Sequence, residues 1–167
     1  MQDKLLLEML TYYAGDPMRA QHFIKVHAFA RLIGSCEGLD EKTMHILEAS
    51  AYVHDIGIKK AEELYASSNG KLQEELGPKI ACEMLEGLGY ESGVIDRICY
   101  LVGHHHTYSD IDGLDYQILV EADFLVNLYE DNVGKEPSTR AIVHTYDTIF
   151  KTETGRRLCA EMFGLKI

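Results

Sequence analysis

Several segments of the chain carry a histidine or an aspartate on the apolar side of a helical pattern. These residues are His27, the pair His54–Asp55, one of His104 and His105, and Asp123. A single buried histidine is usually a hydrogen-bonded structural residue, and Asp123 alone could pair with a lysine. Burying several imidazoles and two carboxylates in one small core is costly unless a cation compensates them. Together, these residues predict a site for a divalent cation.

The candidate ligands are imidazole nitrogens and carboxylate oxygens, and no thiolate is among them. The cysteines are far apart and form no CxxC pair, so we expect them to be reduced, buried, small apolar groups. They are Cys36, Cys82, Cys99 and Cys159. This ligand set argues against a closed structural zinc site. It favours an open site that holds divalent Fe, Mn, Mg, Ni or Zn, together with water.

The elements that must position these residues are helices, because the chain shows helical periodicity and no convincing strand alternation. We therefore expect an all-α fold, a compact helical bundle. Asp16 before Pro17, and Asp40, are typical helix N-caps. The pattern predicts helices from about 5 to Gly15, 17–34, from Asp40 to Gly57, 59–66, one starting at 77–78, 91–105, 114–131, one starting at Pro137, and a last one ending near 163. The helix 17–34 would place Phe23, His27 and Ala30 on one stripe.

Length and charge limit the possible partners. The chain has 167 residues, so we expect a single domain over 1–167. The formal charge of −11 argues against a surface for a nucleic-acid polymer or an anionic membrane, both of which need cationic side chains. No apolar run approaches a membrane span and no export signal opens the chain, so a cytoplasmic location is expected. A homo-oligomer is compatible with the sequence.

The motif Val53–His54–Asp55–Ile56–Gly57, with His27 upstream and Glu121–Ala122–Asp123–Phe124–Leu125 downstream, resembles the HD-domain superfamily of metal-dependent phosphohydrolases. The order of the motifs is His, His-Asp, Asp, and a helix, a turn and a second helix suit the gap between His27 and His54. The resemblance covers about residues 19–132. It implies a helical bundle around one or two metal ions, with His27, His54, Asp55 and Asp123 as ligands of the first.

In members of this superfamily with two metals, the aspartate at the position of Asp55 bridges the ions, and further ligands come from the helices between the motifs. The segment 103–106 falls where such members place one or two histidines. His105 shares an apolar stripe with Ile98 and Leu101, so we favour it slightly over His104. His106 is expected to face solvent.

A further second-metal ligand is less well defined. A subgroup that cleaves diadenosine polyphosphates has a histidine directly before Gly-Pro, where this chain has Leu76. Glu75, one residue further back, could supply a carboxylate instead. Alternatively, Glu74 and Glu75 are a solvated charge pair, and the site holds one metal or a weaker second one.

The resemblance implies hydrolysis of a phosphate ester or anhydride of a small molecule, with a nucleotide as the favoured substrate. A bound cation would lower the pKa of its water toward neutrality and so supply the nucleophile that phosphorus needs. Asp55 would hold the metal and orient the nucleophile. Lys59 or a nearby histidine could protonate the leaving oxygen. Lys59 and Lys60 could each reach a phosphate, although a lysine directly after the glycine is common in the superfamily and Ile58 stands there instead.

Other readings of the same residues remain open. The cyclic-di-GMP branch of the superfamily is disfavoured, because no Gly-Tyr-Pro follows the histidine run. A di-iron oxygenase of the same fold would use a similar Asp/His ligand set and would require oxygen. A non-catalytic nucleotide sensor would bind its ligand without turnover, but it would have no need for all four ligands of the first metal.

Overall fold

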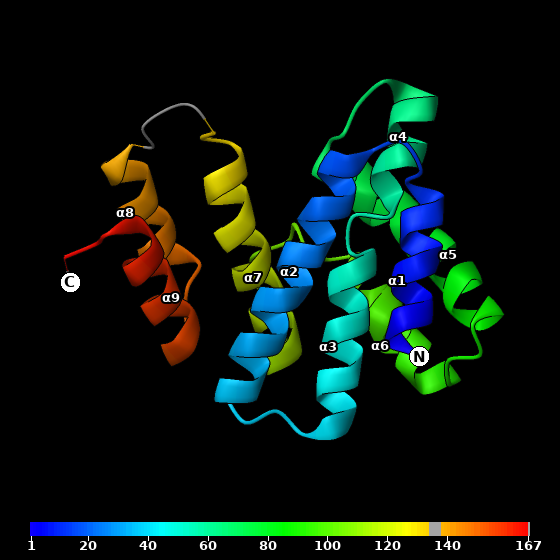
Figure 1. Cartoon of the computed structure of the whole chain (residues 1–167), viewed down its shortest axis with the longest axis horizontal. Coiled ribbons are helices and arrows are strands. Elements are labelled where there is room, and N and C mark those ends of the chain that lie inside the picture. The colour runs from blue at the N-terminus through cyan, green and yellow to red at the C-terminus, as the bar shows by residue number, and fades with distance from the viewer. Residues whose placement is uncertain (134–137, 167) are drawn as a thin grey trace.

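The computed structural model describes residues 1–133 and 138–166, and this part of the chain is helical with no β-strand (Figure 1). The predicted all-α fold is therefore confirmed. The helices of the described residues are α1 (Gln2–Tyr12), α2 (Pro17–Cys36), α3 (Glu41–Val53), α4 (Gly57–Tyr65), α5 (Gly70–Gly87), α6 (Ser92–Val102), α7 (Leu114–Glu130), α8 (Thr139–Thr148) and α9 (Glu153–Phe163). None of these helices has the combination of length and apolar character that crossing a bilayer requires.

Side-chain caps fix the starts of the two helices that lead into the motif. The Asp16 carboxylate accepts a hydrogen bond from the Arg19 amide at 3.1 Å, and Pro17 occupies the first helical position of α2. The Asp40 carboxylate accepts from the amides of Lys42 and Thr43 at 2.9 and 3.0 Å, which starts α3. Both predicted caps are confirmed.

Helix α5 differs from the expectation, because it starts at Gly70 rather than at 77–78. The Asn69 side chain accepts from the Lys71 amide at 2.9 Å and caps the helix, and Pro78 lies inside it. Proline has no amide hydrogen, so one helical hydrogen bond is missing at this point, but the helix continues. The extra turns at the start of α5 carry Gln73 and Glu74.

Two predicted helix ends near the motifs also shift. Helix α3 ends at Val53, so that His54, Asp55 and Ile56 form a turn before α4. Helix α6 ends at Val102, and the histidine run lies in the turns that follow it. The predicted start at Pro137 lies outside the described residues, and α8 begins at Thr139.

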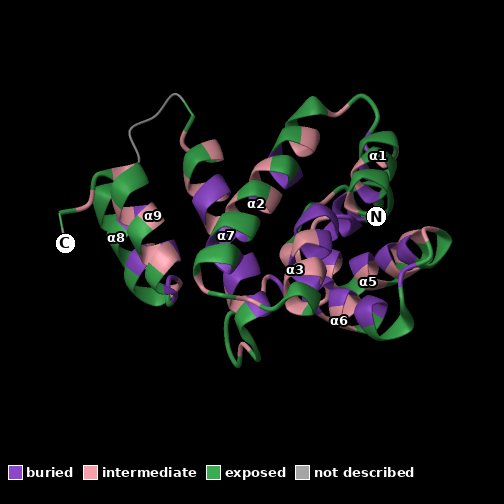
Figure 2. Cartoon of the chain, turned by 60° about the horizontal axis from the view of Figure 1, so that its bottom comes forward, coloured by how far each residue is buried: buried purple, intermediate pink, exposed green. Residues whose placement is uncertain are grey.

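Helices α2, α3 and α7 form the centre of the bundle. Helix α2 packs along α3 and α7, and α3 also contacts α6 and α7. Helices α4, α5 and α6 pack in sequence on one side, while α9 contacts α7 and α2 on the other (Figure 1). Buried residues line the faces where these helices meet (Figure 2). Fully buried members of this core include Phe23, Leu47, Ile98, Leu101 and Leu119.

The glycine of the His-Asp-Ile-Gly motif allows α4 and α5 to touch through their backbones. A Cβ atom built on Gly57 would lie 2.6 Å from the Gln73 carbonyl oxygen and 3.0 Å from the Gly77 amide nitrogen. Contacts this short with backbone atoms cannot be relieved by a rotamer change. Gly57 therefore fixes the distance between the motif turn and the Gln73 turn of α5.

A buried carboxylate joins the C-terminal helices to the bundle. Glu121 on α7 is fully buried and accepts from the backbone amides of Lys151 and Thr152 at 2.6 and 2.9 Å. The Thr152 side chain in turn caps α9 by accepting from the Gly155 amide at 2.9 Å. The glutamate of the Glu-Ala-Asp-Phe-Leu motif is thus a structural residue, two positions before Asp123.

We predict that Gly57→Ala lowers the free energy of unfolding by about 1–3 kcal/mol, because the added methyl group must push α4 and α5 apart. The matched control is Gly87→Ala at the end of α5, where a Cβ would meet nothing within 4 Å. That variant should be neutral or slightly stabilising. Urea unfolding monitored by circular dichroism measures both, and equal midpoints for the two variants would contradict the close-approach argument.

Candidate metal centre

One buried group brings together His22 of α2, His54 after α3, and Asp123 of α7. The Nε2 atoms of the two histidines lie 3.3 Å apart. The Asp123 Oδ1 atom lies 3.2 Å from His22 Nε2 and 3.5 Å from His54 Nε2. All three side chains are buried, so three ligand atoms from three helices converge in the core.

A second group lies beside the first and consists of Asp55, His105 and His106. Asp55 Oδ2 lies 3.5 Å from the Nε2 atoms of both His22 and His54, and its Oδ1 lies 3.3 Å from His105 Nε2. Asp55 therefore stands between the two groups and faces both with different oxygen atoms.

The histidine tautomers fit a cation. His22, His54 and His105 each use Nδ1 to bond an oxygen atom that accepts, so Nδ1 carries the hydrogen and a neutral ring keeps a lone pair on Nε2. The partners are Glu130 Oε2 at 2.8 Å, the Ala51 carbonyl at 3.0 Å and the Val102 carbonyl at 2.8 Å, respectively. The Nε2 of His105 is buried and has no hydrogen-bond partner. Three lone pairs thus face the carboxylates of Asp55 and Asp123, which is the donor set of a divalent cation.

Neighbouring side chains hold these ligands in place. The Tyr13 hydroxyl of α1 donates to the Asp55 carbonyl at 2.8 Å and fixes the motif turn. The Asn127 amide donates to Asp123 Oδ1 at 2.9 Å from one turn further along α7. Lys25 pairs with Glu130, the carboxylate that orients His22. The ligands are therefore held by hydrogen bonds from outside the cluster.

The electrostatics of the metal-free centre show how strongly these groups depend on one another. Burial raises the pKa of the Asp55 and Asp123 carboxyls, but the surrounding imidazoles outweigh it and hold both pKa values well below their usual range. Burial lowers the pKa of His22, but the carboxylates of Asp123, Asp55 and Glu130 outweigh it and raise the pKa to about 9. His105 also has a raised pKa, because Asp55 outweighs its burial.

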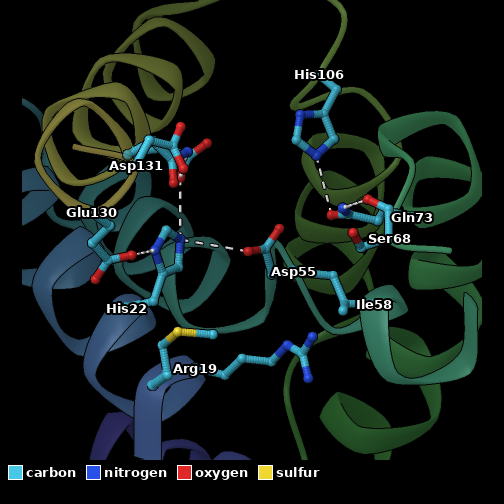
Figure 3. Close-up of a pocket in the computed structure, with 12 residues that line it drawn as sticks. Arg19, His22, Asp55, Ile58, Ser68, Gln73, His106, Glu130 and Asp131 are labelled. Carbon is cyan, nitrogen blue, oxygen red and sulfur yellow. Dashed lines mark hydrogen bonds and ion pairs between the residues drawn. The ribbon is translucent and has the colours of Figure 1, made fainter. Parts of the chain in front are cut away.

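The centre opens into a cavity of about 520 Å³ (Figure 3). Arg19, His22 and Glu130 line one side of it, and Gln73 and His106 lie across from them, with Asp55 between. A small molecule can therefore reach His22, Asp55, His106 and Asp123, whereas His54 and His105 are buried behind the cavity lining.

The structure corrects the prediction for His27. Its ring stacks on Tyr52 with centroids 4.1 Å apart, and its Nε2 faces Glu48 at 3.4 Å, away from the cluster. Burial lowers the pKa of His27. His22 stands in the cluster in its place, because five residues along a helix rotate a side chain by about 140°. The other predicted first-metal residues, His54, Asp55 and Asp123, do come together.

Among the residues considered for a second metal, the structure favours His105, as the sequence did, and differs from the expectations for Glu75 and His106. The structure places His105, but not His104, beside Asp55, and the His104 ring stacks on Tyr100 with centroids 4.2 Å apart. Glu75 is exposed on α5 and lies outside the cluster. His106, which was expected to face solvent, lines the cavity instead.

The predicted phosphate-binding lysines lie outside the cavity lining. The Lys59 amino group donates to the Tyr12 carbonyl at 2.8 Å, and the Lys60 amino group pairs with Glu63 at 3.3 Å. Helix α4 turns both side chains away from the centre. Arg19 lines the cavity and is held by Asp16 at 2.7 Å and Glu62 at 2.6 Å.

Sequence reasoning missed His22, His106, Gln73 and Arg19. For His22 a signal was present, because His22, Val26, Ala30 and Ile33 form a buried stripe on α2. His106 stands in the histidine run that the sequence singles out, but it was expected to face solvent. No signal marked Gln73, because its contact with His106 is tertiary.

Comparisons with known proteins agree with this architecture. The family model of the HD domain matches residues 19–145. No curated protein matches the chain. Among solved structures, the chain is similar to a predicted HD superfamily hydrolase from an uncultured Thermotogales bacterium, with 22% identity, a TM-score of 0.69, and coverage of 97% of this chain and 84% of that chain. It is also similar to YpgQ of Bacillus subtilis, with 18% identity, a TM-score of 0.66, and coverage of 98% and 88%. Identities this low establish a shared fold.

We predict that His22→Gln and His27→Gln, two matched changes on α2, differ in bound metal. Protein purified without chelator should lose its divalent cation in His22→Gln, because a converging ligand is removed, and should keep it in His27→Gln. Elemental analysis measures the metal content of both variants. Loss of metal from His27→Gln with retention in His22→Gln would restore the sequence-based ligand set.

We further predict that the chelator-treated protein loses stability as pH rises from 6.5 to about 9. In the metal-free fold the pKa of His22 is raised from 6.5 to about 9, so its protonation stabilises the folded state fully below pH 6.5. That contribution disappears as the pH passes through the folded pKa, and His105 acts in the same direction. Across this pH range the urea midpoint should fall less steeply for His22→Gln than for the wild-type protein. An unchanged slope would contradict the raised pKa of His22.

Proposed function

Because the chain belongs to the HD-domain family, we propose that it is a metal-dependent phosphohydrolase that cleaves a phosphate ester or anhydride of a small molecule. The observation that carries this proposal is the set of histidine Nε2 lone pairs that face Asp55 and Asp123 in a buried centre open to a cavity. The proposed ligands of the main cation are His22, His54, Asp123 and Asp55. The group of Asp55, His105 and His106 offers residues for a second one.

A bound divalent cation would supply Lewis acidity toward a phosphoryl oxygen and make water a better nucleophile at neutral pH. Asp55 has the position to orient that water, because it is ionised, partly accessible, and placed between the two groups. Tyr13 holds the Asp55 backbone, so the carboxylate is fixed before substrate arrives.

Arg19 is our proposed phosphate-binding residue in place of Lys59 and Lys60. Its guanidinium lies on the cavity wall, and Asp16 and Glu62 fix its direction. A planar guanidinium matches the oxygen atoms of a phosphate better than a flexible ammonium group does. Arg19 would therefore bind a phosphate that extends from the metal centre.

An aromatic pair near the centre supports a nucleotide as the substrate. The rings of Tyr108 and Phe124 meet edge to face with centroids 5.2 Å apart, and Tyr108 is 45% exposed. The Tyr108 hydroxyl lies 3.5 Å from Nδ1 of the cavity residue His106. An exposed ring next to a phosphate site can stack on a base. Tyr116, in contrast, is fully buried in the core.

The decisive experiment combines elemental analysis of protein purified without chelator with a phosphatase screen of small phosphorylated molecules across divalent metals. We expect bound metal and release of phosphate or a phosphorylated product without oxygen. Turnover that requires oxygen, with an iron-specific spectrum, would identify a di-iron oxygenase instead. Tight nucleotide binding without turnover with any metal would identify a sensor.

We predict that Arg19→Gln raises KM about 10- to 100-fold, with a smaller effect on kcat, because one charge-assisted phosphate contact is lost. Lys60→Gln is the control on the neighbouring surface, where the lysine pairs with Glu63, and its KM should be unchanged. Steady-state kinetics with the best substrate of the screen measure both variants. A larger effect for Lys60→Gln than for Arg19→Gln would reverse the assignment.

A further inference from the structure

The metal centre has two halves, the group of His22, His54 and Asp123 and the group of Asp55, His105 and His106. These halves are not equally free to bind a cation. In the half formed by Asp55, His105 and His106, the His106 Nε2 atom already bonds Gln73 Oε1 at 3.1 Å. Gln73 is 5% exposed and lies across the cavity from His22 (Figure 3).

The direction of this hydrogen bond is fixed by the amide of Gln73. Its Nε2 donates to the Ser68 carbonyl at 2.8 Å, so its Oε1 is the atom that faces His106 and must accept. His106 Nε2 therefore carries a hydrogen atom. That nitrogen has no lone pair for a cation, and the other ring nitrogen, Nδ1, is turned to the Tyr108 hydroxyl at 3.5 Å.

The start of α5 also prevents His106 from turning away. Glu74 accepts from the His106 amide at 3.0 Å and from the Thr107 hydroxyl at 3.0 Å. The His106 ring lies against Gly70, where a Cβ atom would come within 2.8 Å of His106 Cδ2. The ring is thus held between α5 and the turn after α6.

The first half of the centre lacks such a competitor. His22 and His54 direct Nε2 toward Asp123 and Asp55, and their Nδ1 atoms are the bonded ones. The first half therefore offers two imidazole nitrogens and two carboxylates. The second offers His105 and the shared Asp55, with His106 engaged by Gln73.

We propose that Gln73 is a positioning residue that limits this centre to one tightly bound divalent cation, by holding the Nε2 hydrogen of His106 and so keeping that ring from binding a second. The inference rests on the metal centre of the proposed function. It attributes the number of bound cations to Gln73, which is not itself a ligand of the first cation.

The test is the Mn²⁺ stoichiometry of the full chain, measured by titration calorimetry and by electron paramagnetic resonance. Wild-type protein should bind one Mn²⁺ tightly and show the spectrum of an isolated ion. Gln73→Glu places a carboxylate oxygen beside Asp55 and His106. It should bind a second Mn²⁺ at least about 10-fold more tightly than wild type does and show a spin-coupled pair.

Gln21→Glu adds the same charge at an exposed position of α2 and should keep wild-type stoichiometry. Gln73→Leu separates a released His106 from a merely added carboxylate, because it removes the acceptor and frees His106 Nε2, and it should also strengthen the second Mn²⁺ site. A second ion in Gln73→Glu but not in folded Gln73→Leu would overturn the role of Gln73. One Mn²⁺ in wild type, together with the second ion in the Gln73 variants alone, supports the proposal.

The other outcomes separate the two proposals. Wild-type protein that binds no Mn²⁺ or other divalent cation would overturn the metal centre and the proposed function with it. Two equally tight Mn²⁺ ions in wild type would overturn only the role of Gln73. So would a single ion in every folded variant, or a second ion gained equally by Gln21→Glu.

Discussion

The structure depends on the burial of two carboxylates, Asp55 and Asp123, against imidazole rings. Hydrogen bonds at Nδ1, on the side away from the carboxylates, hold these rings in place. Burying these charged carboxylates in an apolar core would cost folding free energy, and their mutual repulsion would add to that cost. Hydrogen bonds at Nδ1 direct the Nε2 atoms of His22, His54 and His105 toward them. The same geometry suits a proton in the metal-free protein and a divalent cation in the loaded one, so the histidines and carboxylates compensate each other in either state.

The rest of the bundle keeps these side chains in position. Helices α2, α3 and α7 pack on one another and bring together His22, His54 directly after α3, and Asp123, and the Gly57 contact sets α5 against the motif turn. Glu121 fixes the C-terminal helices to α7 close to Asp123. A change in any of these contacts would move a ligand atom, because each ligand lies on or directly after a helix rather than on a long loop.

The asymmetry of the centre links fold to function. His106 lies near enough to serve a second cation, but Gln73 engages it, and Gln73 reaches it only because α5 begins at Gly70 and runs through Pro78. The additional turns at the start of α5 thus affect the chemistry as well as the shape. Arg19 lines the same cavity, and the exposed ring of Tyr108 contacts the cavity residue His106.

The sequence by itself determined the helical class, the N-caps at Asp16 and Asp40, and the motif residues His54, Asp55 and Asp123, because periodicity, capping and short motifs are local properties. Only the tertiary structure decided between His22 and His27, since the face of α2 that meets α7 depends on how the two helices pack. It also turned Glu75, Lys59 and Lys60 away from the cavity and brought Gln73 to His106. Those outcomes depend on the rotation of α4 and α5 about their axes and on contacts between residues more than thirty positions apart, which no local pattern encodes.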